Sequence, residues 1–412
     1  MFDTIKLENG VSIVMEQISS VRSVALGIFI KNGSINENKK TNGISHFIEH
    51  MLFKGTSKRT SKDIAEEMDN IGGQLNAFTS KEYTCYYARV LDTHIDKAID
   101  ILTDMLFNSE FNENDIEKEA KVIIEEISMY EDSPEDIVFT ELQKKVWKNS
   151  PLEYSVLGSK ENVANFKQQD FFDYMKEKYV GENTVIAIAG NFDKESILHT
   201  IKEKVQNMAK GVSSLEANKS YVYIPSKSKI YKDIEQLHLV ISFEGVSFNS
   251  KYNYSMSLLN TIFGGGMSSI LFQKIREEHG LAYSIYSYNS NYINNGLFNI
   301  YVGLNKSHLD KTINIIKHEI NNLKKVKISR EQIDKTKEQL KSNYIMGLES
   351  TPNRMSSIGR SKILLGKIKT PDEIIKEVEL IKKEDIDYLI DNIFDIDKMS
   401  ISLVGRVDDI NL

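Results

Sequence analysis

Two histidines and a glutamate stand within one five-residue stretch of the chain, at His46, Glu49 and His50. In a helix, residues four apart lie one turn apart on the same side, so both imidazoles can reach one ion. A helix is indicated because apolar residues recur at its spacing, at Ile44, Phe47, Ile48, Met51 and Leu52. At about 100° per residue, the two histidines are expected to point away from this apolar stripe. That orientation argues against two core histidines and leaves a solvated polar face as the simpler alternative to a metal site.

The order of these residues is H-x-x-E-H, the inverse of the H-E-x-x-H pattern of zinc peptidases. A catalytic zinc takes three protein ligands and keeps an open position for water, so His46 and His50 leave one ligand to be found. Glu49 is better suited to be a general base, because a base must reach the water rather than the metal. The third ligand is therefore expected far away in the sequence.

An acidic helix is expected over residues 114–130, where apolar residues again recur at helical spacing. Glu119 and Glu126 are seven residues apart and share a face at the edge of its apolar stripe, whereas Glu125 projects into solvent. We therefore predict Glu126 as the third ligand and Glu119 as a partner that holds a histidine N–H. The simpler alternative is that these carboxylates are only solvated, as most acidic residues on helices are.

Together these residues resemble the inverted zinc metallopeptidases, the family that includes pitrilysin, insulin-degrading enzyme and the mitochondrial processing peptidase. In that family H-x-x-E-H is followed about 75 residues later by a glutamate, with another glutamate seven residues before that one. Here Glu126 follows His50 by 76 residues, and Glu119 precedes Glu126 by seven. The resemblance covers nearly the whole chain, because two further regions match in the same order.

The first of these regions, residues 73–80, resembles the strand that lines the family's substrate cleft. The resemblance implies that Asn76, Ala77 and Phe78 hold an extended peptide as an added strand. The second region, residues 276–283, begins with an arginine and ends with a tyrosine. The resemblance implies that Arg276 and Tyr283 contact the substrate near the zinc, where they are suited to stabilise an oxyanion.

The chain also repeats itself at an offset of 214 to 215 residues. Near the end of each half, an Asp-Tyr pair precedes a strand-like run that ends in glycine, over 173–193 and 387–408. Near the start of each half, the strand-like runs 25–30 and 239–243 have the same offset. Two copies of one unit of roughly 200 residues follow from this pattern.

We therefore predict a catalytic zinc-binding domain at 1–209, a linker at 210–219 and a homologous domain without metal at 220–412. The turn at Asn9 and Gly10 predicts a hairpin, and several returning strands follow it. Each domain is expected to have the α+β class, with a mixed, mostly antiparallel sheet and helices packed on one side.

The second half lacks a histidine pair in the corresponding segment, 254–260, so it is not expected to hold a second zinc. Its glycine run at 264–266 has the composition of a phosphate-binding turn at a helix start. No Gly-Lys-Ser/Thr follows, which argues against a phosphate loop. A turn beside the substrate cleft is the better interpretation.

Composition is typical of a globular protein of two domains, with 412 residues of which 41% are hydrophobic. We expect no membrane span, because no stretch approaches about 20 apolar residues, and no secretory signal. The one cysteine, Cys85, suits a reducing cytoplasm. A net charge of −7 does not indicate a basic surface that would bind nucleic acid.

The predicted function is zinc-dependent endopeptidase activity, with one Zn²⁺ per chain. Expected substrates are peptides or unfolded segments, enclosed in a chamber between the two domains. The resemblance implies a pair of chains, either a homodimer or a dimer with a related subunit. The alternative from another class is a non-catalytic scaffold or partner subunit, because this fold also occurs in such proteins.

Overall fold

The computed structural model describes residues 2–212 and 219–410, and it divides into two compact units. Unit 1 comprises 1–127, 154–217 and 345–370, and unit 2 comprises the three remaining segments. Each unit thus contains a piece of the other half of the chain. The predicted boundaries at 209 and 220 describe the sequence repeat and stay a prediction, and most of the predicted linker, 213–218, lies outside the described residues.

Unit 1 contains a six-stranded mixed sheet of order β1-β2-β6-β3-β5-β4. Only β2 and β6 pair in parallel; every other neighbouring pair is antiparallel. β4 lies at one edge, paired with β5 alone. The strands are β1 (Phe2–Lys6), β2 (Ser12–Gln17), β3 (Ser23–Ile30), β4 (Gln74–Thr79), β5 (Thr84–Leu91) and β6 (Thr184–Gly190).

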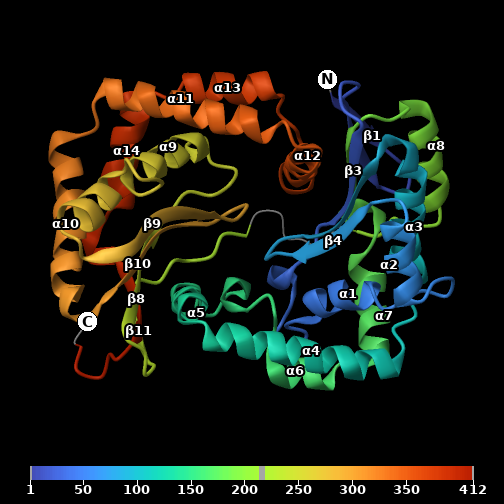
Figure 1. Ribbon diagram of the computed structural model, residues 1–412, viewed down its shortest axis with the longest axis horizontal. Helices are drawn as coiled ribbons and strands as arrows, with labels where there is room; N and C mark the ends of the chain where they lie inside the picture. Colours follow the sequence, from blue (N-terminus) through green and yellow to red (C-terminus); the bar gives the residue numbers. More distant parts are fainter. Residues whose placement is uncertain (1, 213–218, 411–412) are drawn as a thin grey trace. The chain divides into compact units, whose positions relative to one another are not determined.

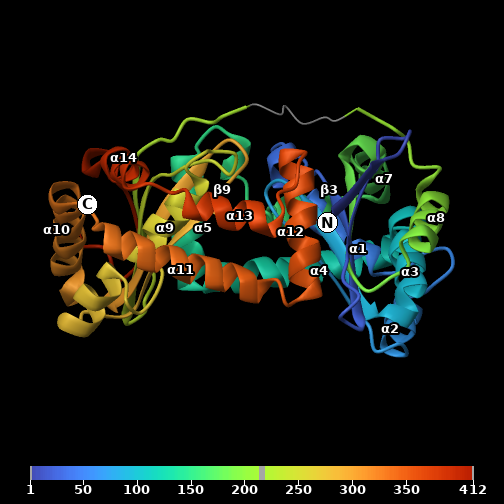
Figure 2. The same ribbon diagram turned by 90° about the horizontal axis from the view of Figure 1, so that it is seen from above.

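The two faces of this sheet are covered by different helices. Along β3, Leu26 and Ile28 point into the main core, where α1 and α3 pack, whereas Gly27 and Phe29 point to the opposite face. On that opposite face lies α12 (Thr351–Leu365), seen beside β3 in Figure 1 and Figure 2. The other helices of the unit are α1 (Ile44–Leu52), α2 (Ser61–Asp69), α3 (Ile95–Asn108), α6 (Lys160–Asn165), α7 (Gln168–Lys178), α8 (Lys194–Val205) and most of α4 (Glu113–Asp132).

Unit 2 contains a five-stranded sheet of order β7-β11-β8-β10-β9. Its order and strand directions reproduce those of β2-β6-β3-β5-β4, with β7 and β11 as the parallel pair. The predicted repeat and the α+β class are thereby confirmed. Helices cover both faces of the sheet in unit 1, however, rather than one side as predicted, because α12 packs on the second face. The strands are β7 (Lys227–Tyr231), β8 (Gln236–Glu244), β9 (Ala282–Asn291), β10 (Gly296–Asn305) and β11 (Ser400–Gly405).

The core of unit 2 lies on one face of its sheet, and α5 (Pro134–Val146) packs on β7, β8 and β11. Because α5 precedes α12 by about one repeat offset, each sheet is covered by a helix from the opposite half of the chain. The remaining helices are α9 (Asn253–Phe263), a π-helix (Phe272–Glu278), α10 (Leu309–Val326), α11 (Arg330–Gly347), α13 (Pro371–Glu379) and α14 (Lys383–Ile393).

The contact between α12 and the sheet of unit 1 is unusually close. A Cβ at Gly359 would overlap the Phe29 ring, and a Cβ at Gly27 would overlap the Met355 sulfur. Only glycine lets the backbones approach this far. No helix of the described residues combines the length and apolarity needed to cross a bilayer.

Candidate metal centre

The structure brings His46, His50 and Glu126 together, although they come from two helices. One possible ligand atom from each lies within 4.8 Å of the others. Nε2 of His46 is 3.7 Å and Nε2 of His50 is 3.6 Å from Oε2 of Glu126. The histidines come from α1 and the glutamate from α4, so this convergence depends on how these two helices pack.

His50 is oriented from behind by a carboxylate that is itself held by a cation. Its Nδ1 lies 2.8 Å from Oε1 of Glu119, while Oε2 of Glu119 lies 2.5 Å from Nζ of Lys54. Burial raises the pKa of Glu119, but the hydrogen bonds from His50 and Lys54 outweigh burial and leave that pKa below its usual value. An ionised Glu119 accepts the Nδ1 proton and leaves the Nε2 lone pair of His50 free for a metal.

His46 is far less exposed than the helical pattern predicted. It is 7% exposed, because neighbouring elements cover the face of α1 that was expected to point into solvent. Burial, followed by the neighbouring His50, lowers the pKa of His46 to about 3. His46 is therefore neutral at pH 7, as a metal ligand must be.

Glu49 lies on the same helix, with its carboxylate facing the end of β4. The hydroxyl of Thr79 donates a hydrogen bond to its Oε2. Burial raises the pKa of Glu49, although the Thr79 hydrogen bond and the charge of His50 partly oppose the shift. A carboxylate with a raised pKa is suited to accept and then release a proton near neutral pH.

The predicted substrate strand, with Asn76, Ala77 and Phe78, is β4, whose second edge is not paired within the sheet. The N–H of Ala77 is bonded to the side-chain oxygen of its neighbour Asn76 at 2.8 Å. Phe78 contacts the ring of Tyr83 at 5.7 Å between centroids. An unpaired edge of this kind can accept a further strand.

Arg276 and Tyr283 lie in unit 2 and contact one another. The Arg276 guanidinium is 4.9 Å from the centre of the Tyr283 ring and 4.8 Å from that of Phe272. Tyr283 is 78% exposed, which excludes the alternative that it is a core aromatic. The predicted contact of this pair with substrate stays a prediction.

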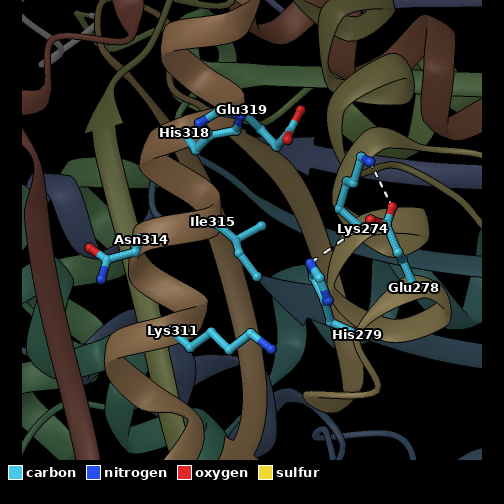
Figure 3. A pocket seen from close by; sticks show the side chains of 8 residues that line it. All are labelled: Lys274, Glu278, His279, Lys311, Asn314, Ile315, His318 and Glu319. Atoms are coloured by element: carbon cyan, nitrogen blue, oxygen red, sulfur yellow. Dashed lines mark hydrogen bonds and ion pairs between the residues drawn. The ribbon is translucent and has the colours of Figure 1, made fainter.

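Unit 2 also contains a polar cavity of about 660 Å³ between the π-helix and α10. In Figure 3, Lys274 and Glu278 lie next to one another on the wall formed by the π-helix, where they form an ion pair of 2.6 Å. His279 and His318 also line it, but among the described residues they join no group with metal-ligand spacing. The cavity therefore does not resemble the centre in unit 1.

Three residues that contact side chains of this centre or the start of α1 were not predicted from the sequence: Lys54, Thr79 and Glu37. Lys54 follows His50 by four residues, so helical spacing could have placed it on the same side. Glu37 accepts backbone hydrogen bonds from the first turn of α1, and Thr79 ends β4. No pattern in the sequence indicates these last two contacts.

The donor set fits zinc. Two neutral imidazoles and one carboxylate are the ligands of a common type of catalytic zinc site, and a carboxylate behind one histidine is usual there. Glu125, the competing carboxylate, is exposed, whereas Glu126 is partly buried. The fold and this centre together define a protein with the layout of an inverted zinc peptidase.

Comparison with known proteins supports the same class. The pattern of the family described as "Insulinase (Peptidase family M16)" matches residues 12–160, and that of "Peptidase M16 inactive domain" matches residues 165–340. An uncharacterised zinc protease, YmxG, of Bacillus subtilis is 44% identical over 94% of each chain. An uncharacterised zinc protease of Rickettsia felis is 39% identical over 95% of each chain. The chain belongs to peptidase family M16.

Solved structures share the fold at lower sequence identity. A protease from Helicobacter pylori matches with a TM-score of 0.90 at 19% identity, over 98% of this chain and 99% of that one. A chain of Complex III2 from Candida albicans matches with a TM-score of 0.86 at 22% identity, over 100% of this chain and 97% of that one. The fold is thus found in a protease and in a chain of Complex III2, so function must be argued from the site.

Proposed function

We propose that this chain is a zinc-dependent endopeptidase that hydrolyses peptides or unfolded polypeptide segments. The observation that carries the proposal is the convergence of His46, His50 and Glu126, with Glu49 beside them. The relatives named zinc proteases support it. A scaffold protein would have no need of a carboxylate and an ammonium arranged behind a histidine.

In this proposal His46, His50 and Glu126 hold one Zn²⁺ per chain. When bound, the ion supplies a Lewis acid for the scissile carbonyl and lowers the pKa of a water. Glu49 accepts the proton of the attacking water and later donates it to the leaving amine. Thr79 holds the Glu49 carboxylate at the end of β4, where the scissile bond would lie.

The peptide is proposed to add to β4 as a further strand. Its main-chain hydrogen bonds would require little of the peptide's amino-acid sequence. For Ala77 to donate its N–H to substrate, the side chain of Asn76 must turn away, since it occupies that donor. Arg276 and Tyr283 are proposed to contact the substrate from the second repeat, inside a chamber. The family resemblance supports this part, and also a pair of chains, either a homodimer or a dimer with a related subunit. The single cysteine, Cys85, supports a location in the reducing cytoplasm.

Cleavage of a mixed library of unfolded peptides by the purified chain tests the proposal, with bound metal quantified. Glu49→Gln should keep zinc and lose about 10²–10⁴-fold in rate. Glu126→Gln should lose metal as well, because it removes a ligand charge. Glu125→Gln, one residue away on the exposed side of α4, is the matched control and should behave as wild type.

Other outcomes separate the alternatives. Zinc binding without cleavage in the wild type would indicate that a partner chain or a particular substrate is missing. Absence of metal binding in the wild type would overturn the proposal and favour the non-catalytic scaffold. Sedimentation of the same preparation reports whether two copies associate.

A further inference from the structure

The helix that carries both histidines begins without a cap of its own. The residue before α1 is Gly43, which has no side chain and a φ of +100°. A Cβ there would lie 2.8 Å from the Cα of Gly158, so a larger capping residue does not fit. The first N–H groups of α1 therefore need an acceptor from elsewhere in the chain.

Glu37 supplies that acceptor from a preceding loop. Its Oε2 accepts hydrogen bonds from the N–H of Gly43 at 2.8 Å and the side chain of Asn42 at 2.9 Å. Its Oε1 accepts from the N–H of Ser45 at 2.9 Å. Glu37 is only 4% exposed. Burial raises the pKa of Glu37, and the hydrogen bonds from Gly43, Ser45 and Asn42 oppose that shift. The N-terminal end of a helix is electropositive and likewise favours the charged form.

The residue next to the first histidine is held from a second direction. Ser45 is fully buried, and its hydroxyl lies 3.0 Å from the side-chain nitrogen of Asn32 and 3.2 Å from the Tyr174 hydroxyl. Tyr174 in turn donates to the side-chain oxygen of Asn32 at 3.0 Å. The three side chains form a closed, buried network, so Ser45 is fixed through both its backbone and its side chain.

The charge of Glu37 is partly balanced by a buried lysine. Burial lowers the pKa of Lys81 to about 8, and the charge of Glu37 opposes that shift. The Lys81 ammonium donates to the carbonyl of Tyr154. Burying a carboxylate among N–H donors and near a cation costs desolvation free energy. Removing that carboxylate also costs free energy, because its buried partners are left unpaired.

We propose that Glu37 is a positioning residue of the metal centre, which fixes the first turn of α1 and thereby the placement of His46 before metal binds. The metal-binding part of this inference rests on the proposed function. Ser45 directly precedes His46, so loss of the Glu37 hydrogen bonds frees the turn that carries the first ligand. Metal sites tolerate only about 0.5 Å of displacement in their ligands.

The test compares Glu37→Gln and Glu37→Asp with Asp104→Asn. Glu37→Gln replaces one acceptor oxygen by an NH₂ group that faces N–H donors, whereas Glu37→Asp keeps the charge. Asp104 is the matched control, because it is 3% exposed in the same unit and accepts hydrogen bonds from Thr56 and Asn108, both at 2.7 Å. Amide hydrogen exchange of residues 43–52 is measured on the metal-free proteins, followed by zinc affinity, kcat and KM.

Glu37→Gln should accelerate exchange in the first turn of α1, weaken zinc binding about tenfold or more, and lower kcat with KM unchanged. Glu37→Asp should restore part of each effect. Asp104→Asn should lower the unfolding midpoint but leave exchange in α1 and zinc affinity as in wild type. The inference is overturned if Glu37→Gln and Asp104→Asn affect α1 exchange equally at equal loss of stability. Should the wild type bind no zinc, the proposed function fails, while exchange in the metal-free chain still decides what Glu37 does.

Discussion

At the scale of single residues, the candidate metal centre is surrounded by side chains that are not themselves among its proposed ligands. Glu119 is buried behind His50, and its charge is kept by two donors, His50 and Lys54. Such partners orient the ligand and raise its basicity. The cluster of His50, Glu119 and Lys54 is therefore a unit, in which loss of one member weakens the other contacts.

Lys54→Met should weaken metal binding about tenfold. The substitution keeps an apolar stem of similar length but removes the ammonium, so the pKa of Glu119 rises and its hold on His50 weakens. Competition with a chelator measures the affinity. Lys97→Met is the control, because Lys97 forms a comparable ion pair of 2.8 Å with Glu67 and is exposed to a similar degree. Equal affinities in the two variants would contradict the assignment.

Asp104 should make the protein acid-sensitive. Burial raises its pKa, but hydrogen bonds from Thr56, Asn108 and Arg59 outweigh burial and leave the pKa below its unfolded value. The stabilisation is therefore complete above the unfolded pKa of about 3.9 and is lost as pH falls through the folded pKa.

Asp104→Asn should lower the free energy of unfolding by about 1–3 kcal/mol at pH 7, and the difference from wild type should shrink below about pH 4. Urea unfolding at a series of pH values measures this. Asp69→Asn, at an exposed position on α2, should change stability little at any pH. A constant difference across the series would show that the charge of Asp104 does not matter.

At the scale of elements, a helix from the opposite half of the chain packs on the second face of each sheet. This helix is α12 in unit 1 and α5 in unit 2. The side chains of β3 alternate between the main core and this second face, so both faces of the strand are buried. A strand that is buried on both faces requires an element packed on each face. In unit 1, α12 packs on the second face.

Gly359→Ala should destabilise the protein by about 1–3 kcal/mol, because the added methyl group meets the Phe29 ring. Gly347→Ala is the matched control in the preceding helix. No atom lies within 4 Å of the Cβ that it would add, so it should be neutral or stabilising by up to about 1 kcal/mol. Thermal unfolding compares the two. Similar midpoints would mean that α12 can shift at little cost.

The open edge of β4 gives a prediction for substrate binding. Ala77→Pro removes one N–H from that edge and should raise KM about tenfold, with zinc content unchanged, since one hydrogen bond to substrate is lost. Ala77→Ser keeps the N–H and should retain the wild-type KM. Peptide kinetics on both variants would exclude strand addition at β4 if their KM values agreed.

At the scale of the whole molecule, the same sheet topology occurs in two units with different proposed roles. The strand order β2-β6-β3-β5-β4 recurs as β7-β11-β8-β10-β9, but α9 carries no counterpart of the histidine pair of α1. The second repeat is thus free to contribute to substrate contact rather than to metal binding. Its half-buried Arg276 and exposed Tyr283 are the residues proposed for that role.

Arg276→Ala should lower kcat/KM for peptides about 100-fold, the usual effect of removing one oxyanion donor, with zinc content unchanged. Lys274→Ala removes a neighbouring cation from the same π-helix and is the control. Full activity of the Arg276 variant would refute a catalytic contribution from the second repeat.

The sequence by itself determined the class of fold and the residue types that make up the candidate site. The spacing of His46, Glu49 and His50 places them on one helix whatever surrounds it, because helical geometry is local. The repeat offset likewise predicted two similar units, and the sheets share their order.

Only the tertiary structure decided how these elements meet. His46 is buried rather than solvated, because other elements cover the face of α1 that its own sequence leaves polar. The contacts of Thr79 with Glu49, and of Glu37 with the start of α1, join segments whose spacing follows no helical or strand period. The exchange of α5 and α12 depends equally on packing, since an amphipathic helix specifies a face to bury but not the sheet that will bury it.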